Sequence, residues 1–157
     1  MDGIFGWLGD HGAHQDLIRY MGRAAGLSPE GLLHEHSSQM LGVAACSRFG
    51  KADIHVENGL AAALTGRPVF LDGELAFIAR DRNPAMAVAH GWIRHGEKLP
   101  TLMQGNFAFA VLEPLKKKAC LVLDRIGAER LCYAHRGGQS VFNMDIGLAE
   151  ARTCRHT

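Results

Sequence analysis

Residues 102–111 read LMQGNFAFAV, and this stretch decides what kind of fold the chain forms. Its apolar run predicts a strand over 106–112. Three more apolar runs follow and predict further strands, over 119–123, 131–134 and 141–144. The last two are joined by Arg136-Gly137-Gly138-Gln139, which is a hairpin signal. The run Lys116-Lys117-Lys118 stands between the first two, where a solvated hairpin turn explains it.

The part of the chain before this stretch mixes helices and strands. Helices are predicted over 14–25 with a stop at Gly26, from Ser28-Pro29 through Leu33, and from Asn83-Pro84 to a stop at Gly96. Short apolar segments predict strands at 3–6, 41–46, 61–64 and 68–71. Because the two element types occur in blocks instead of strict alternation, the pattern favours an α+β fold of antiparallel sheets packed with helices.

Composition limits the class of protein. The chain has 157 residues, which suits a single domain spanning 1–157. Its formal net charge of +1 argues against nucleic acid or an anionic membrane as the main partner. Its start lacks the features of a signal peptide, and it contains no stretch of about 18 apolar residues. The four cysteines form no CxxC or zinc spacing, so we expect a reduced, soluble, cytoplasmic protein.

Nine histidines raise the question of a metal site. The pairs closest in sequence are His11/His14, His34/His36 and His90/His95. Histidines five positions apart do not share a helix face, and no pair comes with a third ligand at a suitable spacing. The sequence therefore predicts surface histidines and no metal site.

Two loops carry acidic residues beside glycine. Asp72-Gly73-Glu74 follows an apolar run, so it stands at a strand end, where the glycine would admit a ligand and the carboxylates could meet an ammonium group. On these residues alone, a plain turn of Asp and Gly is the favoured interpretation. Asp124-Arg125-Ile126-Gly127 also joins two predicted strands. We interpret it as structural, held by a loop ion pair or by a buried arginine.

Five motifs in one order resemble a known family. They are MxGIFGW at the start, VFLDGE at 69–74, LMQGNFAFAV at 102–111, LDRIG at 123–127 and LCY at 131–133. Together they resemble the glutaminase domain of asparagine synthetases, which are class II glutamine amidotransferases. The corresponding family motifs are MCGI(F)G, NGE(I)YN, L-x-G-x-FAFA and RD-x-(L)G-x-x-P-L-Y. The resemblance spans nearly the whole chain.

The resemblance implies a fold and a chemistry. The family has the four-layer α-β-β-α sandwich of N-terminal nucleophile (Ntn) hydrolases, with two antiparallel sheets between helices. After removal of methionine, the cysteine that becomes the first residue attacks the glutamine amide, and its own α-amine, of pKa about 7.7–8.0, acts as the base. The released ammonia passes to an ATP-using synthetase domain.

This chain departs from the family at the positions that perform the reaction. Asp2 stands at the nucleophile position, and methionine is not efficiently removed before aspartate, so both nucleophile and base are lost. The family asparagine that helps to stabilise the oxyanion corresponds to Asp72, whose charge would oppose the reaction. Gly73 and Glu74 match the family, and Arg48 is the candidate for its substrate-binding arginine. The resemblance thus implies a vestigial pocket of Asp2, Arg48, Asp72, Gly73 and Glu74, with no active catalytic residue.

The resulting hypothesis is a catalytically silent glutaminase-like domain. Such losses are found in β-lactam synthetases and lasso-peptide cyclases, where an internal amine replaces ammonia. The SGG-x-DS loop of the ATP-pyrophosphatase domain is absent from these 157 residues, so ATP and Mg²⁺ are expected only through a separate synthetase partner. Two alternatives stay open. One is a ligand-sensing or protein-interaction module that reuses the emptied pocket, and the other is an amidase that uses Cys46 or Cys132.

Overall fold

The computed structural model describes residues 3–10, 17–24, 33–47, 51–126 and 131–144. Its strands are β1 (Gly3–Leu8), β2 (Leu33–Ser37), β3 (Leu41–Cys46), β4 (Lys51–Glu57), β5 (Leu60–Phe70), β6 (Met103–Glu113), β7 (Lys118–Leu123), β8 (Leu131–Arg136) and β9 (Gln139–Met144). Its α-helices are α1 (Leu17–Ala24), α2 (Gly73–Asp81) and α3 (Pro84–His95), and two short 3₁₀ segments cover Gly96–Leu102 and Pro114–Lys116.

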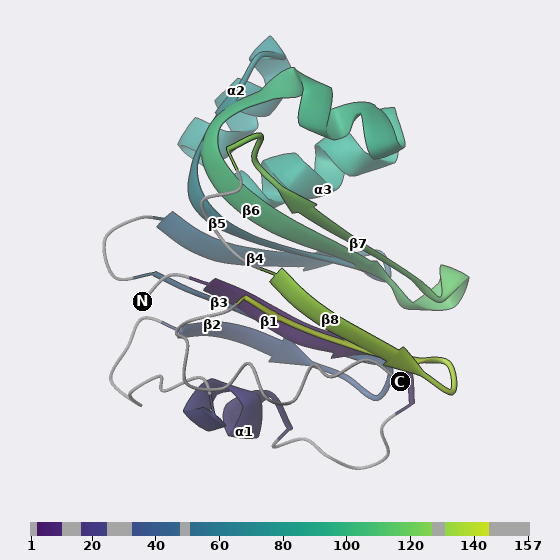
Figure 1. The fold of residues 1–157 in the computed structure, drawn as a ribbon. Coiled ribbons are helices and arrows are strands. Elements are labelled where there is room, and N and C mark those ends of the chain that lie inside the picture. The colour runs from purple at the N-terminus through teal and green to yellow at the C-terminus, as the bar shows by residue number, and fades with distance from the viewer. Residues whose placement is uncertain (1–2, 11–16, 25–32, 48–50, 127–130, 145–157) are drawn as a thin grey trace.

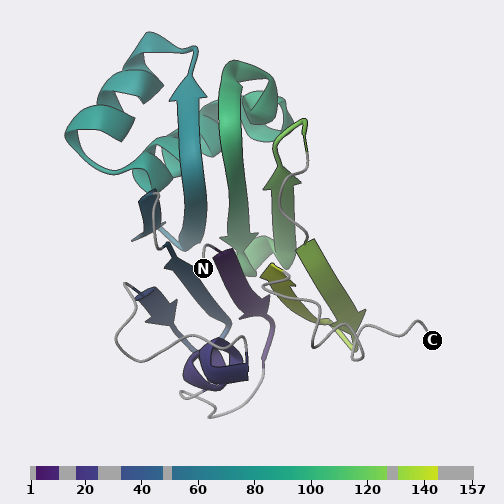
Figure 2. The ribbon, with the colours of Figure 1, turned by 60° about the vertical axis from the view of Figure 1, so that its left-hand side comes forward.

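The strands form two antiparallel sheets. The first has the order β2-β3-β1-β9-β8, and the second has the order β4-β5-β6-β7. Figure 1 shows the sheets stacked face to face, with α1 outside the first sheet and α2 and α3 outside the second. Figure 2 shows from another side that β5 and β6 run side by side and carry these two helices. The prediction of an α+β fold with two antiparallel sheets is confirmed.

Strand β1 lies at the centre of the first sheet and contributes to two cores. It pairs with β3 on one side and β9 on the other, and all six of its residues are buried. Because side chains alternate along a strand, Ile4 and Leu8 point into the core between the sheets, while Phe5 and Trp7 pack against α1. Gly6 also faces the other sheet. A Cβ there would lie 2.4 Å from the Gly42 carbonyl oxygen, so only glycine fits.

The FAFA motif supplies the same alternation in β6. Ala108 and Ala110 lie in the core between the sheets, together with Ala61 and Ala63 of β5. Phe107 and Phe109 point the other way, into the core beneath α2 and α3, where their rings stack with centroids 6.1 Å apart. The small alanine side chains allow the two sheets to pack closely on one face of β6. The large phenylalanine rings fill the space between the sheet and the helices on the other face.

The helix predicted from Asn83-Pro84 to Gly96 is confirmed as α3. The Asn83 side chain accepts hydrogen bonds from the backbone N–H groups of Ala85 and Met86, at 2.6 and 3.1 Å. Proline occupies the first helical position, where its missing N–H costs nothing. Gly96 ends the helix with a φ of 55°, a conformation that favours glycine.

Most predicted strands are confirmed, with changes in extent. The segment 41–46 is β3, and the four C-terminal strands and the strand at the start are all present with longer bounds. The segments 61–64 and 68–71 form one strand, β5, which continues through Gly66 at a φ of 99°. Both hairpin turns are confirmed: Gly137 and Gly138 have φ values of 58° and 79°, and Lys117 has a φ of 52° between β6 and β7.

Two strands and one α-helix were not predicted. Strand β4, helix α2 and β2 after its first residue lie in segments where the sequence predicts no helix or strand. The helix predicted over 14–25 is present as α1 within the described residues, whereas the one from Ser28 falls on residues 25–32, outside them, and its last residue, Leu33, begins β2. None of the described helices combines the length and the apolar character needed to cross a lipid bilayer.

Candidate functional site

The predicted pocket is described only in part. Asp2 and Arg48 lie outside the described residues, as do His11 and His14. The described part consists of Asp72, Gly73 and Glu74, at the junction of β5 and α2. In Figures 1 and 2, α2 lies on the outer side of the second sheet, whereas β1, which follows Asp2 in the sequence, lies in the first sheet.

Asp72 begins a helix instead of standing in a plain turn. Its backbone is extended, and its carboxylate Oδ1 accepts a hydrogen bond of 3.0 Å from the N–H of Leu75, which makes Asp72 the N-cap of α2. This bond is the main reason that the pKa of Asp72 lies below its usual value, and the positive charge of Arg94 lowers it further. The interpretation of Asp72-Gly73-Glu74 as a simple turn is therefore wrong. The Asp72 carboxylate stabilises the first turn of α2.

Glu74 faces a cation of the protein itself. Its Oε2 lies 2.8 Å from Nη1 of Arg94 on α3, and the two side chains are 58% and 49% exposed. The hydrogen bond from Arg94 lowers the pKa of Glu74, and the same bond raises the pKa of Arg94. Exposed ion pairs of this kind contribute little to stability. Arg94 thus supplies a cation beside Glu74, where the sequence left open an ammonium ligand.

Replacing Asp72 distinguishes its capping role from a charge role. We expect Asp72→Ala to lower the melting temperature by about 2–5 °C, because the first turn of α2 loses its acceptor. Asp72→Asn should leave the melting temperature nearly unchanged, because asparagine caps helices as well as aspartate does. Thermal unfolding followed by circular dichroism measures both. Equal losses in the two variants would contradict the capping role.

The loop after β7 is held by a buried aspartate. Asp124 is 8% exposed, and its carboxylate accepts hydrogen bonds from the backbone N–H groups of Phe107 and Ile126, at 3.1 and 2.8 Å. Arg125 is exposed, so the expectation of a buried arginine is wrong. The structural role assigned to this loop agrees with these bonds, which attach the end of β7 to β6.

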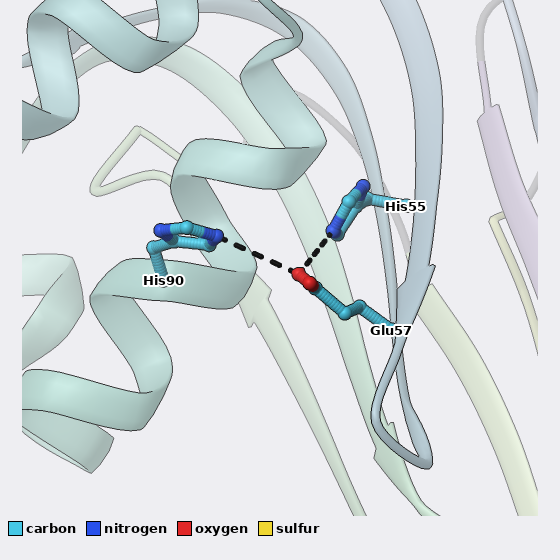
Figure 3. A group of neighbouring side chains, drawn as sticks. All are labelled: His55, Glu57 and His90. Atoms are coloured by element: carbon cyan, nitrogen blue, oxygen red, sulfur yellow. Dashed lines mark hydrogen bonds and ion pairs between the residues drawn. The ribbon is translucent and has the colours of Figure 1, made fainter.

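The structure brings together three side chains that the sequence analysis did not group. His55 and Glu57 lie on β4, and His90 lies on α3. Glu57 Oε2 is 3.1 Å from His55 Nε2 and 3.7 Å from His90 Nε2 (Figure 3). The two rings are arranged edge to face, with centroids 6.4 Å apart. The hydrogen bond from His55 is the largest cause of a lowered pKa of Glu57.

Neither of the two histidine pairs within the described residues, His34/His36 and His90/His95, forms part of one group of possible metal ligands. His34 and His36 do lie on an extended strand, β2, but they belong to no group of three potential ligands among the described residues. His90 joins His55 and Glu57, and His95 is not part of that group. The available signal was the spacing of His55 and Glu57, since alternate residues of a strand share a face.

Neither a scan of protein-family models nor a search of curated protein sequences finds a match for this chain.

Proposed function

We propose that this chain is a catalytically silent glutaminase-like domain with the Ntn-hydrolase fold. It would act as a structural or partner domain of an ATP-dependent, asparagine-synthetase-like enzyme that forms amides or lactams. The observation that carries the proposal is the position of β1. The strand that directly follows Asp2 is buried throughout at the centre of one sheet and packs against the other sheet. A glutaminase of this type needs a strand in that place to hold its first residue.

The chemistry of the residues supports the absence of glutaminase activity. A carboxylate at position 2 is a poor nucleophile toward an amide, and the retained Met1 would leave no α-amine beside it. Asp72 caps α2. By the resemblance it also corresponds to the asparagine that helps to stabilise the oxyanion, and its carboxylate would oppose the negative charge of that oxyanion. ATP and Mg²⁺ belong to the synthetase partner in this proposal, and the domain contributes a docking and stabilising role.

The two alternatives have weaker support. A sensor that binds an amine between the carboxylates competes with Arg94, which already pairs with Glu74. An amidase that uses Cys46 needs an accessible thiol, but Cys46 is 3% exposed and its Sγ contacts the Gly3 carbonyl oxygen at 3.5 Å. Cys132 is half-buried on β8.

Restoring the lost groups tests the proposal. The wild-type chain should retain Met1 by intact mass and release no glutamate from glutamine. The double variant Asp2→Cys/Asp72→Asn should lose Met1 and form one covalent adduct with a diazoketone analogue of glutamine, located at residue 2 by peptide mass mapping. Asp72→Asn alone is the matched control, because it retains every native cysteine and should form no adduct.

Two results would overturn the proposal in different ways. Glutamine hydrolysis by the wild-type chain would show that the domain is not silent. Failure of the folded double variant to form the adduct would show that the two sheets do not carry a glutaminase-like pocket.

A further inference from the structure

The group of His55, Glu57 and His90 has the composition of a transition-metal site. Two imidazoles and one carboxylate are the protein ligands of many catalytic zinc sites, which keep one position open for water. The ligand atoms of the three residues all lie within 4.8 Å of one another. Imidazole nitrogen favours zinc and its neighbours among the divalent cations over magnesium or calcium, which prefer oxygen ligands.

The distances are close to those that a metal requires. Two ligand atoms bound to zinc at tetrahedral angles are separated by about 3.3 Å. The contacts from Glu57 Oε2 to His55 Nε2 and His90 Nε2, of 3.1 and 3.7 Å, fall on either side of this value. The His90 side chain is 38% exposed, so its ring has room to approach His55. Small rotations of side chains would complete the site.

The backbone positions the three ligands on two elements, β4 and α3. Strand β4 is the edge strand of its sheet, and it pairs with β5 from Lys51 to Glu57. Its Ala52 and Ile54 face the core between the sheets, so the alternate residues His55 and Glu57 face the helix layer. Helix α3 is fixed by its buried face and by a hydrogen bond of 3.3 Å from the Asn83 amide to the Ile54 carbonyl oxygen.

We propose that His55, Glu57 and His90 form a binding site for a divalent transition metal, with zinc as its best occupant. The metal would join the edge strand β4 to helix α3 and leave its outward coordination position to water, since the Glu57 side chain is 49% exposed. The site shares no residue with the proposed vestigial pocket, and the proposal does not depend on the loss of glutaminase chemistry.

Zinc binding to the full chain tests this proposal. Calorimetric titration with Zn²⁺ should give a site that depends on the three residues, and the melting temperature should rise by about 5–10 °C when zinc is in 100-fold excess over its dissociation constant. Co²⁺ should give the visible absorption of a four-coordinate site with nitrogen and oxygen ligands. Glu57→Gln and His90→Ala should each weaken zinc binding at least about 100-fold and abolish the cobalt spectrum.

A matched control is available on the other sheet. The double variant His34→Ala/His36→Ala removes two histidines that lie two residues apart on β2, as His55 and Glu57 do on β4. It should retain zinc binding and the cobalt spectrum. Glu57→Gln changes an exposed side chain without changing its shape, so it should fold normally, and circular dichroism in the presence of a chelator checks this. Zinc binding that is unchanged in Glu57→Gln and His90→Ala, or that is lost in the β2 control, would overturn the proposal.

Discussion

Phe109→Ala is expected to lower the free energy of unfolding by about 3–5 kcal/mol. The ring is fully buried in the core between the second sheet and helices α2 and α3. Its removal leaves a cavity beside Phe107, and the strand and helix around it are held in place by their own pairing and packing. Since domains are typically stable by only about 5–15 kcal/mol, this loss is a large part of the total free energy of unfolding. Urea denaturation with linear extrapolation measures the change.

Phe77→Ala is the matched control for this prediction. Phe77 lies on α2, is 54% exposed and has the Arg80 guanidinium 5.5 Å from its ring centroid. Its replacement removes the same ring but much less buried apolar surface, so we expect the free energy of unfolding to fall by less than about 1 kcal/mol. If both variants lost the same free energy, the burial of the FAFA phenylalanines beneath the helices would be contradicted.

The elements that sequence predicts well are those in which apolar residues dominate. Strand β3 is buried throughout and β6 is buried from Phe107 to Glu113, and their apolar runs are visible without any knowledge of the partner strands. Helix α3 is marked at both ends, by Asn83-Pro84 and by Gly96. The face that each residue of β6 presents could not be assigned in advance, because both faces of this strand are covered and neither is polar.

The missed strands lack a continuous apolar run. Strand β4 instead alternates polar and apolar residues, which is itself the signal of a half-buried strand, and it lies at the edge of its sheet. Helix α2 has a single fully buried residue, Leu75, so its apolar stripe is short. Aspartate followed by glycine is common in turns and aspartate is common at helix N-caps, and the residues of 72–74 alone do not separate the two.

The group of His55, Glu57 and His90 could not be predicted from sequence for a different reason. His55 and Glu57 share a face of β4 by their spacing, but His90 reaches them only because α3 crosses that edge of the sheet. Such a contact depends on how a helix packs on a sheet, which no local spacing specifies. The ion pair between Glu74 and Arg94 could not be predicted for the same reason.

Asp124→Ala is expected to lower the free energy of unfolding by about 2–4 kcal/mol. The carboxylate is the acceptor for the Phe107 N–H, and the Asp124 N–H donates in return to the Phe107 carbonyl oxygen at 3.0 Å. Alanine leaves the buried Phe107 N–H without this acceptor, and an unsatisfied buried donor costs more than an ordinary hydrogen bond contributes. Urea denaturation measures the loss, and hydrogen exchange should show a less protected Phe107 amide.

Two further variants determine whether the loss comes from these hydrogen bonds. Asp124→Asn should recover about half of it, because an amide offers one acceptor oxygen where the carboxylate offers two. Asp81→Ala removes an exposed carboxylate whose contact is the surface pair with Arg80, and it should change the free energy of unfolding by less than about 0.5 kcal/mol. An Asp124→Ala variant as stable as Asp81→Ala, with the Phe107 amide still protected, would contradict the role of Asp124. The loss in Asp124→Ala together with exchange at Phe107 would instead show that one buried carboxylate fixes where β7 ends.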